Sequence, residues 1–207
     1  MQVMKFGGTS VNDAKAIGQV VSIVAEQLKQ DPQVVVVTSA MRGVTDLLIN
    51  SANAAARSDR QAYREARQTL IWRHREAAEA LVADLDELAA VQALTDERVR
   101  EFERLCMAVA ILGELTDRGL AVVSGLGERL MAPLLAAAMR SAGLKAQFVD
   151  AGDLIITDDN HASAAPDMDA SRSATRTQLL PLLEHGIVPV ITGFVGATPN
   201  AVPTVLG

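Results

Sequence analysis

The sequence predicts an α/β protein built on a mainly parallel sheet. Short apolar runs alternate along the chain with amphipathic stretches whose apolar positions recur three and four residues apart. One of these runs, residues 34–37, consists only of valine, which is typical of a strand buried on both faces of a parallel sheet. Hydrophobic residues make up 49% and charged residues 21% of the 207 positions, so the chain is neither disordered nor fibrous and can bury a substantial core.

The first part of the chain contains a βαβ unit. Residues 3–6 form a short apolar strand that leads into the turn 7–10, Gly-Gly-Thr-Ser. A helix follows over Ala14–Gln30, and the pair Asp-Pro at 31–32 ends it. The valine run at 34–37 then forms the second strand. Because strand, helix and strand alternate, the two strands are predicted to be parallel.

Helical patterns dominate the middle of the chain. A polar turn at 38–46 precedes a helix, residues 61–85 are charged and helical, and Thr95 is expected to cap a second long helix. We interpret these two long helices as an antiparallel hairpin, residues 60–118, inserted into the sheet domain. The charged run 73–76, Arg-His-Arg-Glu, is interpreted as a solvated helix face and not as a binding patch.

Alternation of strands and helices is predicted to resume near residue 121. Residues 121–123 are expected to form a strand, residues 124–127 a glycine-containing turn, and residues 128–142 an alanine-rich helix in which Pro133 causes a kink or an irregular first turn. The remaining expected elements are strands at 147–149 and near Ile155, a helix at 171–185, a strand at 187–192 that Pro189 disfavours, and a final strand at 204–207.

Charge and composition limit the classes of function. The 19 basic and 25 acidic side chains give a net charge of -6, which argues against nucleic-acid binding. The single cysteine, Cys106, cannot form an internal disulfide, and His74, His161 and His185 lack the spacing of metal ligands, so no metal site is expected. Without a secretory leader or a long apolar run, the protein is expected in the cytoplasm and not at a membrane.

The turn at 7–10 is the first candidate for chemistry. Glycine lets a phosphate approach the backbone, and a strand followed by such a turn and a helix can aim N–H groups at an anion. Lys5 lies just before the turn and can neutralise a phosphoryl group. The same residues are also compatible with a tight turn and a surface lysine that bind no ligand. The spacing fits neither a Walker loop nor a dinucleotide-binding Gly-x-Gly-x-x-Gly.

Two further segments are expected at the carboxyl ends of parallel strands, where open α/β sheets bind ligands. One is residues 39–45. The other is residues 124–128, which would place Glu128 at the start of a helix. There the carboxylate could cap backbone N–H groups or bind the ammonium group of a ligand.

Four ordered motifs resemble those of the aspartokinases. Residues 5–11, Lys-Phe-Gly-Gly-Thr-Ser-Val, resemble the opening motif of this family, and residues 39–46, Ser-Ala-Met-Arg-Gly-Val-Thr-Asp, resemble its second motif. Residues 124–129, Ser-Gly-Leu-Gly-Glu-Arg, are similar to the third, and residues 192–194, Thr-Gly-Phe, to the turn before the fourth. The resemblance covers the entire chain, including the predicted hairpin.

The resemblance implies the amino-acid-kinase fold, a three-layer α/β/α sandwich. It also implies ATP-dependent phosphorylation of the side-chain carboxylate of L-aspartate to 4-phospho-L-aspartate, the first step toward lysine, threonine and methionine. ATP and Mg²⁺ would be required, and no covalent enzyme intermediate is needed. In such a transfer the protein positions two anions and neutralises the charge between them.

Site residues are also implied by the resemblance. Lys5 would be catalytic, stabilising the transferring phosphoryl group. The nucleotide phosphates would be bound by Lys5 together with Phe6, Gly7, Gly8, Thr9 and Ser10. The contacts to aspartate would come from Ser39 and Thr45, from Glu128 as the partner of the α-ammonium group, and from Phe194 at the border of the pocket.

The sequence departs from the family pattern at Gly152, where an arginine is frequent, and at Met131, where a small polar residue is frequent. Aspartokinases also continue past the final Leu-Gly. The 207 residues are therefore expected to be the N-terminal part of an aspartokinase or of a bifunctional enzyme. The nucleotide-binding C-terminal part, which would help to hold Mg²⁺, and the regulatory domains would be absent. The fragment is expected to be inactive alone and, through an unpaired sheet edge, to form homo-oligomers.

Two other functions stay open at this stage. One is a different amino-acid kinase, acting on glutamate, acetylglutamate or a nucleoside monophosphate, although the second and third motifs favour aspartate. The other is a non-catalytic binding or assembly module that retains the contacts to phosphate and aspartate. Calorimetry with aspartate and Mg-ATP separates a kinase, which forms product, from a module, which only binds.

Overall fold

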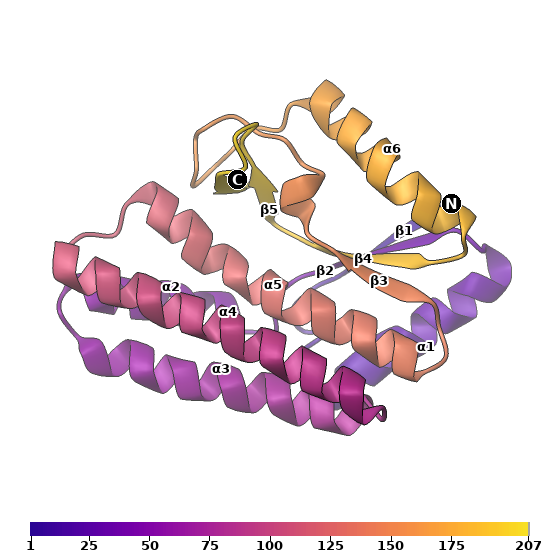
Figure 1. Ribbon diagram of the computed structural model, residues 1–207, viewed down its shortest axis with the longest axis horizontal. Helices are drawn as coiled ribbons and strands as arrows, with labels where there is room; N and C mark the ends of the chain where they lie inside the picture. The colour runs from indigo at the N-terminus through magenta and orange to yellow at the C-terminus, as the bar shows by residue number, and fades with distance from the viewer. Residues whose placement is uncertain (207) are drawn as a thin grey trace.

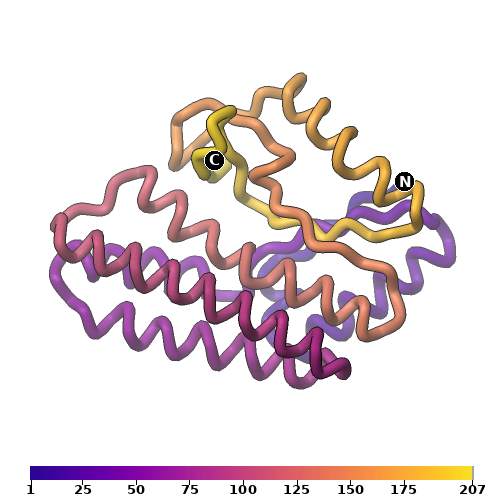
Figure 2. Tube along the Cα trace, in the orientation of Figure 1, coloured from indigo at the N-terminus to yellow at the C-terminus, as the bar shows by residue number. Residues whose placement is uncertain are grey.

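The computed structural model describes residues 1–206 of the chain (Figures 1 and 2). The strands are β1 (Gln2–Phe6), β2 (Val34–Thr38), β3 (Ala146–Val149), β4 (Val188–Thr192), β5 (Val195–Ala197) and β6 (Pro203–Val205). The helices are α1 (Ala14–Gln30), α2 (Val44–Ala56), α3 (Arg60–Leu81), α4 (Leu85–Leu112), α5 (Asp117–Ser141) and α6 (Met168–Glu184), with a 3-10 helix at Ala151–Asp153. The predicted positions of the first two strands and of α1, α6 and β4 are thereby confirmed.

Four strands form one parallel sheet in the order β1-β2-β4-β3. In register, Phe6 lies beside Thr38 and Thr38 lies beside Thr192, so β1, β2 and β4 end together. The loops that follow these strands therefore meet at one edge of the sheet. β5 and β6 form a separate antiparallel pair.

Helices cover both faces of this sheet, which confirms the predicted layered α/β fold (Figure 1). Val34 and Val36 of β2 point into a core shared with α1 and α5, whereas Val35 points into a second core shared with α6. Successive valines of β2 therefore pack into two hydrophobic cores on opposite faces of the sheet, as expected for a strand buried on both faces.

The long helices α3 and α4 lie antiparallel and pack against each other and against α2 and α5 (Figures 1 and 2). Asp59 caps α3 and Asp84 caps α4, each by accepting hydrogen bonds from backbone N–H groups of the first turn. The prediction that Thr95 caps the second helix is wrong. Thr95 is buried inside α4, and its hydroxyl donates to the carbonyl of Val91, one turn earlier.

The predicted strand at 121–123 and turn at 124–127 are also wrong, because both lie within the single helix α5. The helix begins at Asp117, capped by Thr116, and runs past Pro133 to Ser141. Close packing explains the two glycines that suggested a turn. A Cβ atom on Gly125 would lie 2.6 Å from Val195 Cγ1, and one on Gly127 would lie 2.7 Å from Ala40 Cβ.

Gly127→Ala is expected to destabilise the fold, by about 1–3 kcal/mol, because its new methyl group would push against the loop after β2. The matched control is Gly18→Ala in α1, where the nearest atom to the new Cβ, Leu81 Cδ2, would lie at an ordinary 3.9 Å. That change should stabilise the protein by about 0.5–1 kcal/mol through helix propensity. Urea unfolding of both variants checks the prediction, and equal effects would contradict it.

Pro189 is compatible with β4 because its missing N–H group is not needed. Val188 N–H donates to Lys145 O on the β3 side, so the nitrogen of the next residue faces β2. The pairing of β2 with β4 begins only at Val190. The strand predicted near Ile155 is reduced to an isolated bridge between Ile156 and Ala197.

Among residues 1–206, one helix, α5, is long and apolar enough to cross a membrane by length and composition alone. Its most apolar window has a mean hydropathy of 1.4, and 83% of that window is buried inside the fold. Burial of this extent is typical of a helix at the centre of a hydrophobic core.

Candidate active site

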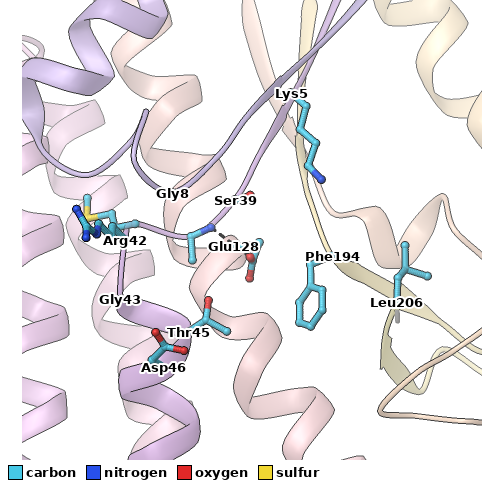
Figure 3. Close-up of a pocket in the computed structure, with 12 residues that line it drawn as sticks. Lys5, Gly8, Ser39, Arg42, Gly43, Thr45, Asp46, Glu128, Phe194 and Leu206 are labelled. Carbon is cyan, nitrogen blue, oxygen red and sulfur yellow. Dashed lines mark hydrogen bonds between the residues drawn. The ribbon is translucent and has the colours of Figure 1, made fainter.

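A cleft of about 540 Å³ opens where β1, β2 and β4 end (Figure 3). Its lining joins segments that are far apart in sequence, namely Lys5, Gly8, residues 39–43, Thr45, Asp46, Glu128, Phe194 and Leu206. Six of the residues singled out in the sequence are therefore brought together: Lys5, Gly8, Ser39, Thr45, Glu128 and Phe194.

One wall of the cleft consists of two loops in backbone contact. Gly8 follows β1, and a Cβ atom on it would lie 2.8 Å from the carbonyl oxygen of Ala40 in the loop after β2. Arg42 N–H donates to the Gly8 carbonyl at 3.1 Å. Only glycine permits this approach. Lys5 extends from β1 toward Glu128 and Phe194 and supplies a positive charge to the cleft (Figure 3).

Glu128 is the buried acid of the cleft, with 4% of its surface exposed. One carboxylate oxygen, Oε1, accepts a hydrogen bond of 3.2 Å from Ala40 N–H. The other, Oε2, is buried without a partner among the described residues. Burial raises the pKa of Glu128 to about 7, although the bond from Ala40 opposes this shift. A buried carboxylate with an unpaired oxygen is suited to bind a cation.

The start of α2 faces the same cleft. Gly43 precedes the helix at φ 76°, and no side chain caps its first turn. Thr45 and Asp46 belong to this turn and line the cleft. An uncapped helix start offers backbone N–H groups and a partial positive charge, which favour a carboxylate or a phosphate.

Phe194 forms the opposite border and has a strained backbone, with φ 66° in a bulky residue. Hydrogen bonds on both sides of it hold this conformation, because Gly193 N–H donates to Thr38 O and Leu206 N–H donates to Phe194 O. The side chain remains 40% exposed at the cleft. Strain of this kind concentrates at functional sites.

Arg129, the neighbour of Glu128 in α5, holds the helix against the end of β3. Its Nε atom lies 2.7 Å from Asp150 Oδ2, and both side chains are largely buried. Asp150 also accepts the N–H group of Gly152. This ion pair fixes the part of α5 that carries Glu128.

The other predicted residues of the first turn do not line the cleft. Phe6 is buried in the core, and Gly7 accepts from Ser10 N–H to close the turn. Thr9 is exposed outside the cleft. A role for Phe6, Gly7, Thr9 and Ser10 in nucleotide binding stays a prediction.

The structure also corrects the interpretation of residues 73–76 as a solvated face. His74 is completely buried, and its Nε2 atom has no partner among residues 1–206. Arg73 is half-buried and donates to the backbone of both cleft loops, at Asn12 and Arg42. Sequence reasoning missed both because a charged helix face does not reveal which of its residues the neighbouring loops cover.

No group of three or more His, Cys, Asp or Glu side chains within the described residues is arranged to hold a metal ion. The charged residues that line the cleft in this part of the chain are Lys5, Arg42, Asp46 and Glu128, and hydroxyl groups and a helix start lie beside them. The cleft suits a small molecule that carries both an ammonium group and anionic groups.

Comparison with known proteins gives consistent matches over this whole region. A family model described as "Amino acid kinase family" matches residues 1–206. The chloroplastic bifunctional aspartokinase/homoserine dehydrogenase 1 of Arabidopsis thaliana is 30% identical over 204 residues, which are 99% of this chain and 22% of that protein. Lysine-sensitive aspartokinase 3 of Escherichia coli is 30% identical over 221 residues, covering 99% of this chain and 43% of that protein.

A solved structure agrees with these matches. The crystal structure of E. coli aspartokinase III in complex with aspartate and ADP superposes with a TM-score of 0.87 and 25% identity. The superposition covers 99% of this chain and 43% of that one. The chain thus spans less than half the length of the relatives it matches.

Proposed function

The chain belongs to the amino acid kinase family, and we propose that its cleft binds L-aspartate and transfers the γ-phosphoryl group of ATP to the side-chain carboxylate. The observation that carries this proposal is the unpaired, buried oxygen of Glu128 at a cleft that also contains Lys5. L-Aspartate has the matching groups, one ammonium and two carboxylates. The E. coli relative of known structure binds aspartate and ADP, which supports the choice of substrates.

In this proposal the substrate is fixed by its charges. Glu128 binds the α-ammonium group through Oε2. Ser39, Thr45 and the uncapped start of α2 bind a carboxylate, and the ring of Phe194 closes the side of the pocket. Burial of Glu128 strengthens the attraction because little water screens it.

The transfer itself needs charge compensation. A side-chain carboxylate oxygen of aspartate forms a bond to the γ-phosphorus, the bond from that phosphorus to the β,γ-bridging oxygen breaks, and ADP leaves with the electron pair. Lys5 stabilises the negative charge on the transferring group, and the backbone at Gly8 lets the phosphate approach closely. Mg²⁺, when bound with ATP, screens the phosphate charges. No residue of the described part is assigned to hold it.

Several expectations about the whole protein remain predictions. We propose that nucleotide binding is completed by further segments, since the chain spans 43% of the E. coli relative. On this view residues 1–207 alone bind aspartate without turnover, and the complete protein is a cytoplasmic homo-oligomer. Assay of the purified 207-residue chain tests the first point, because turnover at an ordinary enzymatic rate would contradict it.

The proposed reaction is tested with the full-length protein, ATP, Mg²⁺ and hydroxylamine, which traps an acyl phosphate as a coloured hydroxamate. L-Aspartate should give hydroxamate, whereas L-glutamate and N-acetyl-L-glutamate should give none. A nucleoside monophosphate would give a nucleoside diphosphate and no acyl phosphate, so it is tested by ADP release from ATP, which should not occur. Phosphorylation of one of these alternatives would assign a different kinase. Calorimetric binding of L-aspartate without any product would instead indicate a non-catalytic module.

Thr45→Val is expected to weaken L-aspartate binding by about 1–3 kcal/mol, because the valine cannot form the proposed hydroxyl contact. Thr177→Val in α6 is the matched control, since its hydroxyl bonds only to Ser173 O on an exposed face. Calorimetric titration of the full-length protein measures both affinities. Equal affinities of the two variants would remove Thr45 from the binding site.

L-Aspartate should bind about tenfold more weakly at pH 6 than at pH 8, because only the ionised form of Glu128 attracts the ammonium group. The pKa of about 7 means that most of Glu128 is protonated at pH 6 in the free protein. Binding at pH 6 should therefore release a proton, which calorimetry detects in buffers of different ionisation enthalpy. Glu128→Gln should bind weakly at both pH values, and a persistent pH dependence in that variant would contradict the assignment.

A further inference from the structure

We propose that Arg73, on the helix α3, is a positioning residue for phosphoryl transfer that holds the two loops of the cleft together. The proposal concerns the loop after β1, residues 7–13, and the loop after β2, residues 39–43. It rests on the proposed function for its kinetic consequence but not for its structural one. Arg73 itself does not line the cleft.

The contacts of Arg73 reach both loops from one guanidinium group. Nη1 donates to the Arg42 carbonyl at 3.0 Å. Nη2 donates to the Asn12 carbonyl at 3.2 Å and to the Asn12 side-chain oxygen at 3.1 Å. The residues that it binds lie 31 and 61 positions away in sequence. One side chain therefore ties together the carboxyl ends of two strands.

The two loops must be held together because their relative position determines the shape of this wall of the cleft. They touch directly at Gly8, whose carbonyl accepts from Arg42 N–H at 3.1 Å. Arg73 binds the carbonyl of the same Arg42, and so holds the residue that contacts Gly8. A shift of either loop would move Gly8 relative to Ser39 and misalign the two reactants, and misplacement by about 1 Å can cost about a hundredfold in rate.

Charge and shape both favour arginine at this position. The planar guanidinium presents several N–H groups in fixed directions, so it can bind two carbonyls at once, whereas lysine offers a single ammonium centre. Burial lowers the pKa of Arg73. Asp13, which caps α1 by accepting from Ala16 N–H, opposes this shift in part because its carboxylate attracts the charged guanidinium. The guanidinium is thus anchored between α3 and the start of α1.

The next arginine along α3 provides a matched control. Arg75 pairs with Asp96 of α4, with Nη2 2.6 Å from Oδ2, and within residues 1–206 no hydrogen bond or ion pair joins it to either loop. A separate hollow of about 390 Å³ lies beside Arg73 and is lined in part by Asp13 and Trp72. A small guanidinium ion can therefore enter the space that an Arg73→Ala substitution would leave.

The experiment compares Arg73→Ala, Arg73→Lys and Arg75→Ala in the full-length protein. Hydrogen exchange followed by mass spectrometry should show amide exchange about tenfold faster or more over residues 7–13 and 39–43 in both Arg73 variants, and little change there in Arg75→Ala. Aspartate kinase kinetics should show a lower kcat and a higher KM for both substrates in the Arg73 variants. Added guanidinium ion should restore part of the activity of Arg73→Ala and none in Arg75→Ala.

The outcomes separate the two proposals. Unchanged exchange in both loops of Arg73→Ala would show that Arg73 does not hold them and would overturn the inference. Faster exchange with unchanged kinetics would also overturn it, because the loops would then not need to be held for transfer. If the unsubstituted protein phosphorylates no aspartate, the proposed function fails, and the exchange data still decide whether Arg73 holds the loops.

Discussion

Lys5→Ala is expected to lower the turnover of the full-length enzyme by about a thousandfold, because Lys5 supplies positive charge to the cleft in which the transferring phosphoryl group would be stabilised. Lys5 extends from β1 into the cleft, opposite the start of α2 (Figure 3). Loss of an interaction made mainly in the transition state should reduce kcat and kcat/KM together. Steady-state kinetics with L-aspartate and ATP measure the change.

Folding should be nearly unaffected by this substitution. Lys5 is exposed, and its amine forms no hydrogen bond or ion pair with any part of residues 1–206, so the free energy of unfolding should change by less than about 0.5 kcal/mol. Lys29→Ala is the control for loss of one positive charge, since Lys29 lies at the end of α1 and pairs with Glu26. A rate in Lys5→Ala close to that of Lys29→Ala would remove Lys5 from the mechanism.

The placement of most cleft residues followed from simple features of the sequence. Val34–Thr38 is so uniformly β-branched that only a strand buried on both faces suits it, and the preceding helix enforces parallel pairing. Once β1 and β2 are parallel neighbours, Lys5, Gly8, Ser39 and Thr45 must gather at the same edge of the sheet. Local patterns and the topology point to the same arrangement.

The secondary structure around Glu128 could not be predicted from local patterns. The glycines at 125 and 127 suggested a turn after a strand, because glycine in a helix is unfavourable on its own. In the structure they lie within α5, where the approach of Val195 and Ala40 leaves no space for a side chain. Glu128 does line the cleft, but its secondary structure was predicted wrongly, because the glycines are required by a tertiary contact that no local pattern contains.

The sequence also did not reveal which polar residues of the helical hairpin are buried. Arg73 and His74 were expected on a solvated face, yet one binds the cleft loops and the other lies in the core. Both follow from packing of α3 against α2, α1 and α4. A backbone carbonyl lowers the cost of such burial by accepting a hydrogen bond from the buried group, as Leu70 O does from His74 Nδ1 at 2.8 Å.

His74 and Glu128 should make the pH dependence of stability run in opposite directions. Burial lowers the pKa of His74 from 6.5 to about 4. Between these pH values the unfolded chain binds more protons than the folded one, so acidification from pH 6.5 to 4 should cost about 3 kcal/mol of stability. His74→Leu should abolish this loss, because leucine binds no proton in either state.

For Glu128 the sign is reversed, because burial raises its pKa from 4.5 to about 7. The folded protein then binds more protons between these values, so stability should fall by about 3 kcal/mol as the pH rises from 4.5 to 7. Glu128→Gln should remove this loss and stabilise the protein at pH 8. It should also weaken aspartate binding, so stability and function would change in opposite senses at one residue.

The two effects nearly cancel in the unsubstituted protein between pH 4.5 and 6.5, and the variants reveal them separately. Urea unfolding of the 207-residue chain across this range measures each variant as a difference from the parent, in which the contributions of the other acids cancel. The stability of Glu128→Gln relative to the parent should increase with pH, and that of His74→Leu should decrease. Each slope comes from the burial of one ionisable group. Profiles that run parallel in the two variants would therefore show that one of these two groups is not buried in solution.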